Sequence, residues 1–205
     1  MIGDLYERAL EGRGGVEVED GAGRRRPLPV EEWMAPRPGD AALLDRCDGP
    51  TLDVGSGPGR LTVALTERGL LALGIDVAPY AVALTVAAGG PALRRDVFDA
   101  VPGAGIWTTV LLADGNIGIG GDPAALLRRV LGLLAPGGRV LAEVTGPGTR
   151  SYAERVRLRT GQAVGEWFPW AWVSADDMAD LAARCGAAVT EIWEEADRWF
   201  VALSP

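Results

Sequence analysis

The sequence predicts an α/β protein with a doubly wound, mostly parallel β-sheet that ends in an antiparallel strand. Two observations support this fold class. From residue 51 onward, short apolar runs alternate with amphipathic stretches of helical length, which is the pattern of a parallel sheet with helices on both faces. Near the C-terminus, alternating runs at 187–193 and 199–203 are separated by only a short acidic stretch, as expected for an antiparallel strand pair.

The composition is that of one globular domain spanning residues 1–205. Apolar residues make up 48% of the chain, which is enough to form a hydrophobic core. The formal net charge of −8 argues against a nucleic-acid partner, because phosphate backbones are bound by basic surfaces. No stretch resembles a signal peptide or is long enough to span a bilayer, so we expect a cytoplasmic protein without a membrane partner.

Two absent residue types limit the chemistry of this chain. There is no histidine, and all 20 basic residues are arginine. A histidine base, a histidine metal ligand, a Schiff-base lysine and a Ser-His-Asp triad are therefore excluded. Cys47 and Cys185 are isolated in the sequence, so we expect neither a disulfide framework nor a metal site.

Residues 1–40 precede the predicted core. A short helix is expected at 4–11, where apolar residues fall on one side. Residues 16–30 fit either a β-hairpin or an irregular, solvated segment. Asp40 can then cap a helix over 41–46.

Residues 41–144 make up the predicted core. Strands are expected near 51–54, 71–75, 92–95, 107–112 and 139–144, and helices near 58–68, 79–88 and 122–134. Pro58 is expected as the first residue of its helix, and Asp122 as the N-cap of another. The run 135–138, Ala-Pro-Gly-Gly, should end that second helix and turn the chain into the next strand. With the C-terminal pair, the sheet has seven strands.

Residues 145–173 interrupt this alternation. They are rich in glycine, arginine and aromatic residues, and we expect a second hairpin or an irregular lid inserted after the fifth strand. The alternation resumes with residues 174–205, where Ser174 can cap a helix that runs to Arg184 and precedes the final strand pair.

The strand at 51–54 leads into a glycine-rich turn, Gly55 to Gly59, and then a helix. Such a turn lets a ligand lie against main-chain N–H groups at a helix N-terminus, although a purely structural turn is the alternative. Arg60 stands where the dinucleotide fingerprint needs its third glycine, and a P-loop would need a lysine. Asp76 ends the adjacent strand, where its carboxylate can hold two vicinal ribose hydroxyls or cap the following helix.

These features together resemble the cofactor site of the class I S-adenosylmethionine-dependent methyltransferases. The matching segments are Asp53-Val54-Gly55-Ser56-Gly57-Pro58-Gly59, Gly74-Ile75-Asp76, Arg95-Asp96-Val97 and the stretch 131–144. The resemblance covers roughly residues 50–145. It implies the Rossmann-like seven-stranded fold of that family, S-adenosylmethionine as the cofactor, and methyl transfer to a small-molecule acceptor.

The resemblance also implies which residues bind the cofactor. Asp53 would orient the methionyl amino group, and Asp76 would bind the ribose. The residues after the third strand would recognise adenine, and those after the fourth strand would line the sulfonium. The full set is Asp53, Gly55, Ser56, Gly57, Asp76, Val77, Asp96, Val97, Ala113 and Asp114.

Three polar residues are candidates for catalysis. Asp114 and Asn116 follow the fourth strand, where they could orient a substrate or act as base and acceptor. A glycine-rich connection with Asx turns is the alternative for this stretch. Glu143 lies at the end of the fifth strand and is a candidate base.

Aromatic side chains are candidates for binding the substrate. Trp167, Phe168 and Trp170 could wall an apolar pocket, or they could pin the insert to the sheet. Tyr6 could close over the cofactor from the N-terminal helix, or it could pack in the core.

Two other functions are consistent with the sequence. One is a non-methylating protein that binds S-adenosylmethionine on the same fold. The other is a nicotinamide-dependent oxidoreductase, against which Arg60 in the third glycine position argues.

Overall fold

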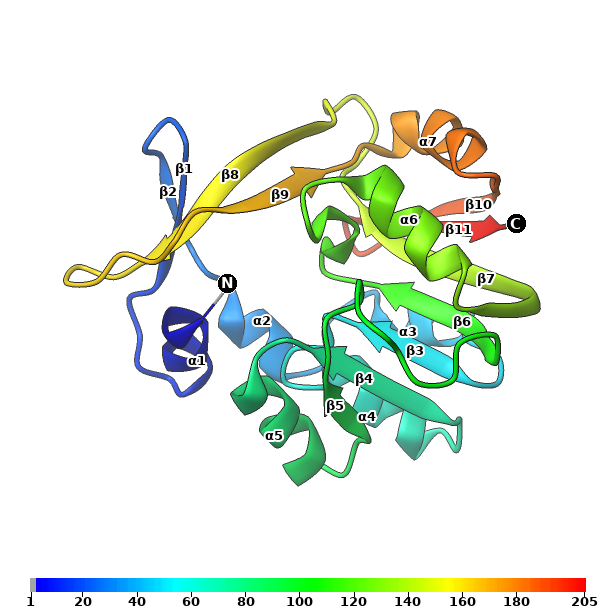
Figure 1. Cartoon of the computed structure of the whole chain (residues 1–205), viewed down its shortest axis with the longest axis horizontal. Helices are drawn as coiled ribbons and strands as arrows, with labels where there is room; N and C mark the ends of the chain where they lie inside the picture. The colour runs from blue at the N-terminus through cyan, green and yellow to red at the C-terminus, as the bar shows by residue number, and fades with distance from the viewer. Residues whose placement is uncertain (1–2) are drawn as a thin grey trace.

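The computed structural model describes residues 3–205, and its larger β-sheet has seven strands in the order β10-β11-β7-β6-β3-β4-β5 (Figure 1). These strands are β3 (Thr51–Val54), β4 (Ala72–Asp76), β5 (Ala92–Arg94), β6 (Trp107–Leu112), β7 (Leu134–Val144), β10 (Ala188–Glu195) and β11 (Arg198–Ser204). β3 to β7 are parallel, whereas β11 pairs antiparallel with both β7 and β10. The predicted fold class is confirmed.

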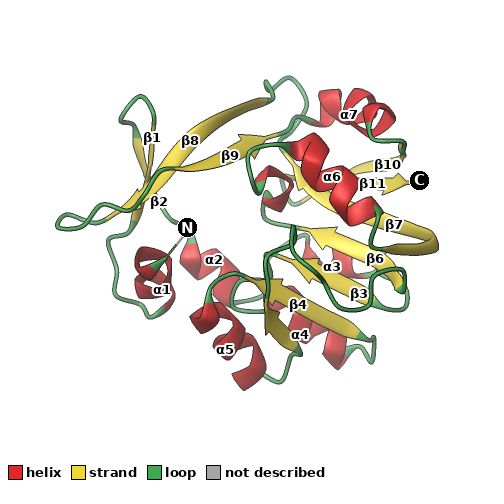
Figure 2. Ribbon diagram, in the orientation of Figure 1, coloured by secondary structure: helices red, strands yellow, loops and turns green. Residues whose placement is uncertain are grey.

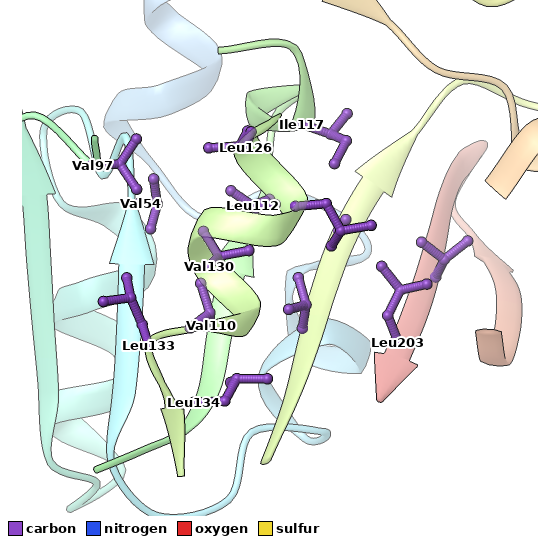
Figure 3. Close-up of a cluster of buried hydrophobic side chains, with 14 of the residues drawn as sticks. Val54, Val97, Val110, Leu112, Ile117, Leu126, Val130, Leu133, Leu134 and Leu203 are labelled. Carbon is purple, nitrogen blue, oxygen red and sulfur yellow. The ribbon is translucent and has the colours of Figure 1, made fainter. Parts of the chain in front are cut away.

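Helices cover both faces of this sheet. α3 (Asp40–Leu44), α4 (Arg60–Glu67) and α5 (Pro79–Ala87) lie on one face, and α6 (Pro123–Leu131) and α7 (Met178–Arg184) lie on the other. Because side chains alternate along a strand, β6 contributes to both layers. Leu111 packs with Leu65 of α4, while Val110 and Leu112 pack with Leu126 and other residues of α6 (Figure 3).

The second sheet has four strands in the order β2-β1-β8-β9 (Figure 2). They are β1 (Glu17–Asp20), β2 (Arg25–Pro27), β8 (Tyr152–Arg159) and β9 (Phe168–Trp172), with α1 (Asp4–Leu10) and α2 (Val30–Met34) beside them. The two segments for which the sequence allowed a hairpin, 16–30 and 145–173, therefore each contain a β-hairpin. β1 also pairs with β8, so the N-terminal segment and the insert share one sheet, which we call the hood.

Four local expectations need correction. Asp40 is the first residue of α3 instead of its cap, because the N-cap position is taken by Gly39. α4 begins at Arg60 instead of Pro58, because Gly59 adopts a left-handed φ of +91° that no helical residue has. α6 ends at Leu131, and β7 already begins at Leu134, so the run 135–138 lies within a strand instead of before one. A register shift in the β6–β7 pairing accommodates this run. A short 3₁₀ helix, η2 (Ala175–Asp177), precedes α7 and receives the Ser174 cap.

Within residues 3–205, every helix is too short or too polar to cross a membrane. The same part of the chain brings no three aspartate, glutamate or cysteine side chains together as ligands for a metal ion.

Candidate active site

A cavity of about 530 Å³ opens between the seven-stranded sheet and the hood. Its floor is formed by residues that follow β3, β4, β5 and β6, because the carboxyl ends of parallel strands meet at one edge of the sheet. The hood, α1 and α2 form the opposite wall. Ligand sites in proteins occupy ~300–1,000 Å³, so the cavity has room for a cofactor-sized molecule.

The glycine-rich turn after β3 lies on the floor, and its geometry requires glycine. Gly55 has a φ of +70°, and a Cβ there would lie 2.8 Å from Nδ2 of Asn116. Gly57 has a φ of +54°, and its Cβ position is open apart from the Tyr6 hydroxyl at 3.3 Å. The turn therefore presents bare main chain to the cavity.

The main-chain N–H groups of this turn are already used within the protein, which corrects the expectation that they face a ligand. Those of Gly55 and Ser56 donate to the carbonyl oxygen of Ile75, at 2.9 and 3.1 Å. That of Gly57 donates to Oδ2 of Asp76 at 2.9 Å. A phosphate group would need such donors to be free, so this turn is not built as a phosphate cradle.

Asp76 ends β4 beside the turn and lines the cavity. Its Oδ1 accepts a 2.8 Å hydrogen bond from the Ala78 N–H, and its Oδ2 accepts from Gly57. Burial raises the pKa of the Asp76 carboxyl, and these two N–H donors oppose that rise. Because a carboxylate has about four acceptor positions, two remain for hydroxyl groups of a ligand. Ala78 is the N-cap residue of α5 and no described side chain caps this helix, so Asp76 does not act as its cap, and the ribose contact stays a prediction.

Asp53 lies on the floor at the end of β3 and is only 3% exposed. Its Oδ2 accepts a 2.7 Å hydrogen bond from the Thr62 hydroxyl of α4. Burial raises the pKa of Asp53 to about 6, so its charge is costly unless a cation comes close. Ser56 lines the cavity, but its buried hydroxyl has no partner among residues 3–205 and sits against the Gly74 position.

Apolar side chains flank the acidic floor. Val77 and Phe98 line the cavity with 36% and 44% of their surface exposed. Val97 is buried, and Asp96 is exposed, with Oδ1 accepting from the Phe98 N–H at 2.9 Å. All four residues line the cavity. The sequence analysis missed Phe98, although it directly follows the Asp96-Val97 pair.

Asp114 and Ala113, after β6, also line the cavity, but Asp114 is held by three arginines. It forms ion pairs with Arg37 at 2.9 Å, Arg60 at 2.6 Å and Arg198 at 3.4 Å. It adopts a left-handed φ of +52°, which the surrounding ion pairs stabilise. Burial raises the pKa of the Asp114 carboxyl, and the charges of Arg60 and Arg198 oppose that rise. Both of its oxygens are engaged by arginines of the protein.

Glu143, at the end of β7, does not fit the expectation of a free base. Arg198 donates to both of its oxygens, at 2.9 and 2.8 Å, and the N–H of Asp114 donates to Oε2 at 2.7 Å. The Glu143 side chain lies next to the loop after β6, outside the described lining of the main cavity. It therefore holds the Asp114 backbone instead of facing a ligand.

Asn116 is likewise committed to the protein. Its Nδ2 donates to the carbonyl oxygens of Val54 and Gly55, at 2.9 and 3.0 Å. The loop after β6 thereby holds the glycine turn after β3. Asn116 is a positioning residue in this arrangement, because its amide donor is not available to a substrate.

The aromatic candidates divide between the two faces of the hood. Phe168 and Trp170 line the cavity together with Trp172, which the sequence analysis did not single out. Trp167 instead lies against Arg157, 4.5 Å from ring centroid to guanidinium, and is absent from the described lining. Tyr6 lines the cavity, and burial, followed by the charges of Asp76 and Asp114, raises the pKa of its hydroxyl well above the usual value.

No model of a known protein family matches this sequence. Solved structures do match the fold. A methyltransferase from Bacteroides fragilis, described as S-adenosylmethionine-dependent and bound to S-adenosylhomocysteine, superposes with a TM-score of 0.80 at 22% identity over 98% of this chain and 92% of that chain.

Two further structures align less closely. The sugar N-methyltransferase KedS8 from a Streptoalloteichus species has a TM-score of 0.59 at 18% identity, over 84% of this chain and 85% of that chain. The 1,6-didemethyltoxoflavin-N1-methyltransferase from Burkholderia thailandensis has a TM-score of 0.59 at 16% identity, over 80% and 75%. The chain therefore has the fold of the class I S-adenosylmethionine-dependent methyltransferases.

Proposed function

We propose that this protein binds S-adenosylmethionine in the cavity and transfers its methyl group to a small-molecule acceptor. The observation that carries the proposal is the Asp76 carboxylate. It is fixed by the N–H groups of Gly57 and Ala78 at the tip of β4, and its remaining acceptor positions suit the two hydroxyls of a ribose.

The rest of the floor supports this choice of cofactor. The buried Asp53, with its pKa of about 6, would gain from a nearby ammonium group such as that of a methionyl chain. The exposed apolar surfaces of Val77 and Phe98 suit an adenine ring. The bare main chain at Gly57 leaves room for the part of the ligand between them. The residues present thus fit an adenosyl ligand that carries positive charge.

The same floor disfavours the oxidoreductase alternative. A nicotinamide dinucleotide carries a pyrophosphate, which is bound by free N–H groups at the glycine turn. Here Gly55, Ser56 and Gly57 spend their N–H groups on Ile75 and Asp76.

When bound, S-adenosylmethionine supplies a methyl group already activated by its sulfonium. The protein's own contribution is then alignment and exclusion of water, and positioning can account for up to ~7–11 kcal/mol of a barrier. Asp114, Glu143 and Asn116 are all committed to internal hydrogen bonds or ion pairs. We therefore infer that they hold the floor in place, and that the acceptor provides its own available lone pair.

Calorimetric titration with S-adenosylhomocysteine and with NAD tests the cofactor assignment. We expect S-adenosylhomocysteine to bind the wild type, and Asp76→Ala to weaken that binding by about tenfold or more, because charge-assisted hydrogen bonds are worth ~1.5–3 kcal/mol. Asp99→Ala is the matched control, since Asp99 is an exposed acid in the same region outside the described lining. Wild-type affinity in a folded Asp76→Ala variant, or tighter binding of NAD, would contradict the proposal.

A second readout separates an enzyme from a protein that only binds the cofactor. Formation of S-adenosylhomocysteine from S-adenosylmethionine in the presence of an acceptor requires methyl transfer. Binding without turnover over a broad acceptor panel would favour the non-methylating alternative.

A further inference from the structure

The two faces of the hood differ in chemistry. Strand residues alternate, so one face carries Glu19 and its ion partners Arg157 and Arg159, at 2.9 and 3.0 Å. The opposite face, which we call the inner face, turns toward the cavity. Its cavity-lining residues from the strands include Val18, Val156, Leu158, Phe168, Trp170 and Trp172. The hood thus offers an apolar, aromatic wall to a ligand.

Arg26 is the exception on this wall. It belongs to β2, lies opposite Val18 in the strand register and lines the cavity. Its guanidinium lies 5.0 Å from the ring centroid of Trp172, although β2 and β9 are the two opposite edges of the hood. The register pairs Arg26 with Val18 and Trp172 with Tyr152, so this contact joins distant parts of the hood across the inner face.

The charge of Arg26 has no acidic partner within residues 3–205. No hydrogen bond or ion pair joins it to any described side chain, and Trp172 offers only a ring. Glu154 belongs to the same alternating set, but its charge interacts with that of Arg24. By contrast, Arg60 on the floor of the same cavity forms ion pairs with Asp40 and Asp114.

Trp172 holds the Arg26 guanidinium in this position. The Trp172 ring is itself stacked on Tyr152, with centroids 4.7 Å apart and planes inclined by 15°. A guanidinium over an aromatic ring keeps its planar set of donors available at the edge. An arginine so placed, beside apolar walls, favours a ligand that carries an acid group on an apolar body.

We propose that the acceptor is an aromatic carboxylic acid, whose ring system lies on the inner face of the hood and whose carboxylate binds Arg26. That this acid is the methyl acceptor rests on the proposed function, whereas the binding of a carboxylate by Arg26 does not depend on methyl transfer. Arg26 is exposed, so an uncharged molecule of the same shape would bind less tightly because it lacks the charge-assisted hydrogen bond to the guanidinium.

The chain supplies a matched control for this assignment. Arg25 precedes Arg26 on the same strand, so its side chain projects from the other face, and it is absent from the described lining of the cavity. Arg25→Gln and Arg26→Gln remove the same charge from adjacent positions. Only the second removes it from the inner face.

The experiment uses 2-naphthoate and its uncharged isostere 2-naphthamide as probes, titrated calorimetrically against the full-length protein. We expect wild type and Arg25→Gln to prefer the carboxylate by about tenfold, the value of a modest charge-assisted hydrogen bond. Arg26→Gln should lose this preference while binding 2-naphthamide as the wild type does. Arg26→Lys, which keeps the charge but not the fork of donors, should retain part of it.

Several results would overturn the assignment. They are equal affinity of the two probes for the wild type, a preference that survives Arg26→Gln, equal losses in Arg25→Gln and Arg26→Gln, or no binding of either probe at millimolar concentration. Titration of the wild type with S-adenosylhomocysteine tests the proposed function separately, because it measures cofactor binding without the acid probe. If the preference for the carboxylate depends on Arg26 but S-adenosylhomocysteine does not bind, the acid-binding site is supported and the proposed methyl transfer is contradicted.

Discussion

The side-chain amide of Asn116 donates hydrogen bonds to the carbonyl oxygens of Val54 and Gly55, so the loop after β6 holds the glycine turn after β3. β3 and β6 are neighbours in the sheet, and the two loops meet at their carboxyl ends. Asn116, which the sequence offered as a catalytic candidate, is therefore one of the residues that shape the floor of the cavity.

Asn116→Ala should therefore lower cofactor affinity instead of abolishing chemistry selectively. Loss of both hydrogen bonds frees the turn from the loop after β6, and we expect affinity for S-adenosylhomocysteine to fall about tenfold. Calorimetric titration measures this change, with Gln162→Ala as the control because Gln162 is an exposed amide in the β8–β9 connection. Unchanged affinity in Asn116→Ala would show that the turn holds its shape alone.

Gly55→Ala should lower the free energy of unfolding by more than the left-handed backbone conformation alone explains. A left-handed residue with a side chain costs ~1–2 kcal/mol, and Gly69→Ala measures that cost at a φ of +78° with no atom within 4 Å of its Cβ position. The Gly55 Cβ would also lie 2.8 Å from Asn116 Nδ2.

Urea unfolding of both alanine variants separates the two contributions. The excess loss of stability in Gly55→Ala should shrink when Asn116→Ala is added, since the clash with Asn116 is then removed and, of the three nearest atoms, only Ile119 Cδ1, at 3.0 Å, remains. Additive effects in the double variant would contradict the proposed collision.

Arg198 compensates buried charge on three acids. Its side chain is 8% exposed and forms ion pairs with Asp40, Asp114 and Glu143. Arg198→Met should lower the free energy of unfolding by about 3–5 kcal/mol, because it leaves Glu143 without an ion pair among residues 3–205 and removes one of the cations that compensate Asp40 and Asp114. Arg68→Met is the surface control: the Arg68–Asp45 pair has side chains 37% and 69% exposed, and its loss should cost ~0–1 kcal/mol. Similar losses in both variants would refute the special role of the buried cluster.

The raised pKa of Asp53 predicts a pH dependence with a definite sign. Burial raises this pKa from 3.8 to about 6, so the folded state holds a proton that the unfolded state has lost between these values. The stability contributed by Asp53 is therefore present below pH ~4 and falls as the pH rises to ~6, by about 3 kcal/mol at most. Asp53→Asn removes this titration.

Thermal melts of wild type and Asp53→Asn between pH 4 and pH 7 measure the effect. The advantage of the asparagine variant should grow with rising pH and level off above pH ~6. An advantage that stays constant over this range would mean that Asp53 titrates normally in the folded protein.

The sequence was sufficient for features that depend on neighbouring residues. Apolar runs located the strands, and Asp122 caps α6 through the N–H groups of Ala124 and Ala125 as expected. The end of a strand also located Asp76 near the turn, because parallel strands align their carboxyl ends.

Features that depend on residues far apart in the chain were not predictable in this way. Glu19 meets Arg157 only because β1 pairs with β8, and alternation within each strand carries no information about its partner. Glu143 was expected to be available as a base. Its pairing with Arg198 arises because β7 lies beside β11, and the sequence alone does not give that neighbour. The start of α4 was misplaced for a local reason, since Pro58 suits a first helical position while the left-handed Gly59 delays the helix.

The most direct test of the central claim is a thermal melt of the wild-type protein alone and with S-adenosylmethionine, S-adenosylhomocysteine or NAD. A ligand at about a hundredfold over its dissociation constant stabilises the folded state by roughly 2.7 kcal/mol. For a chain of this size the melting temperature should rise by roughly 5–11 °C. We expect this rise with S-adenosylmethionine and with S-adenosylhomocysteine, and no rise with NAD. No shift with either adenosyl ligand at millimolar concentration, or a shift with NAD instead, would contradict the account.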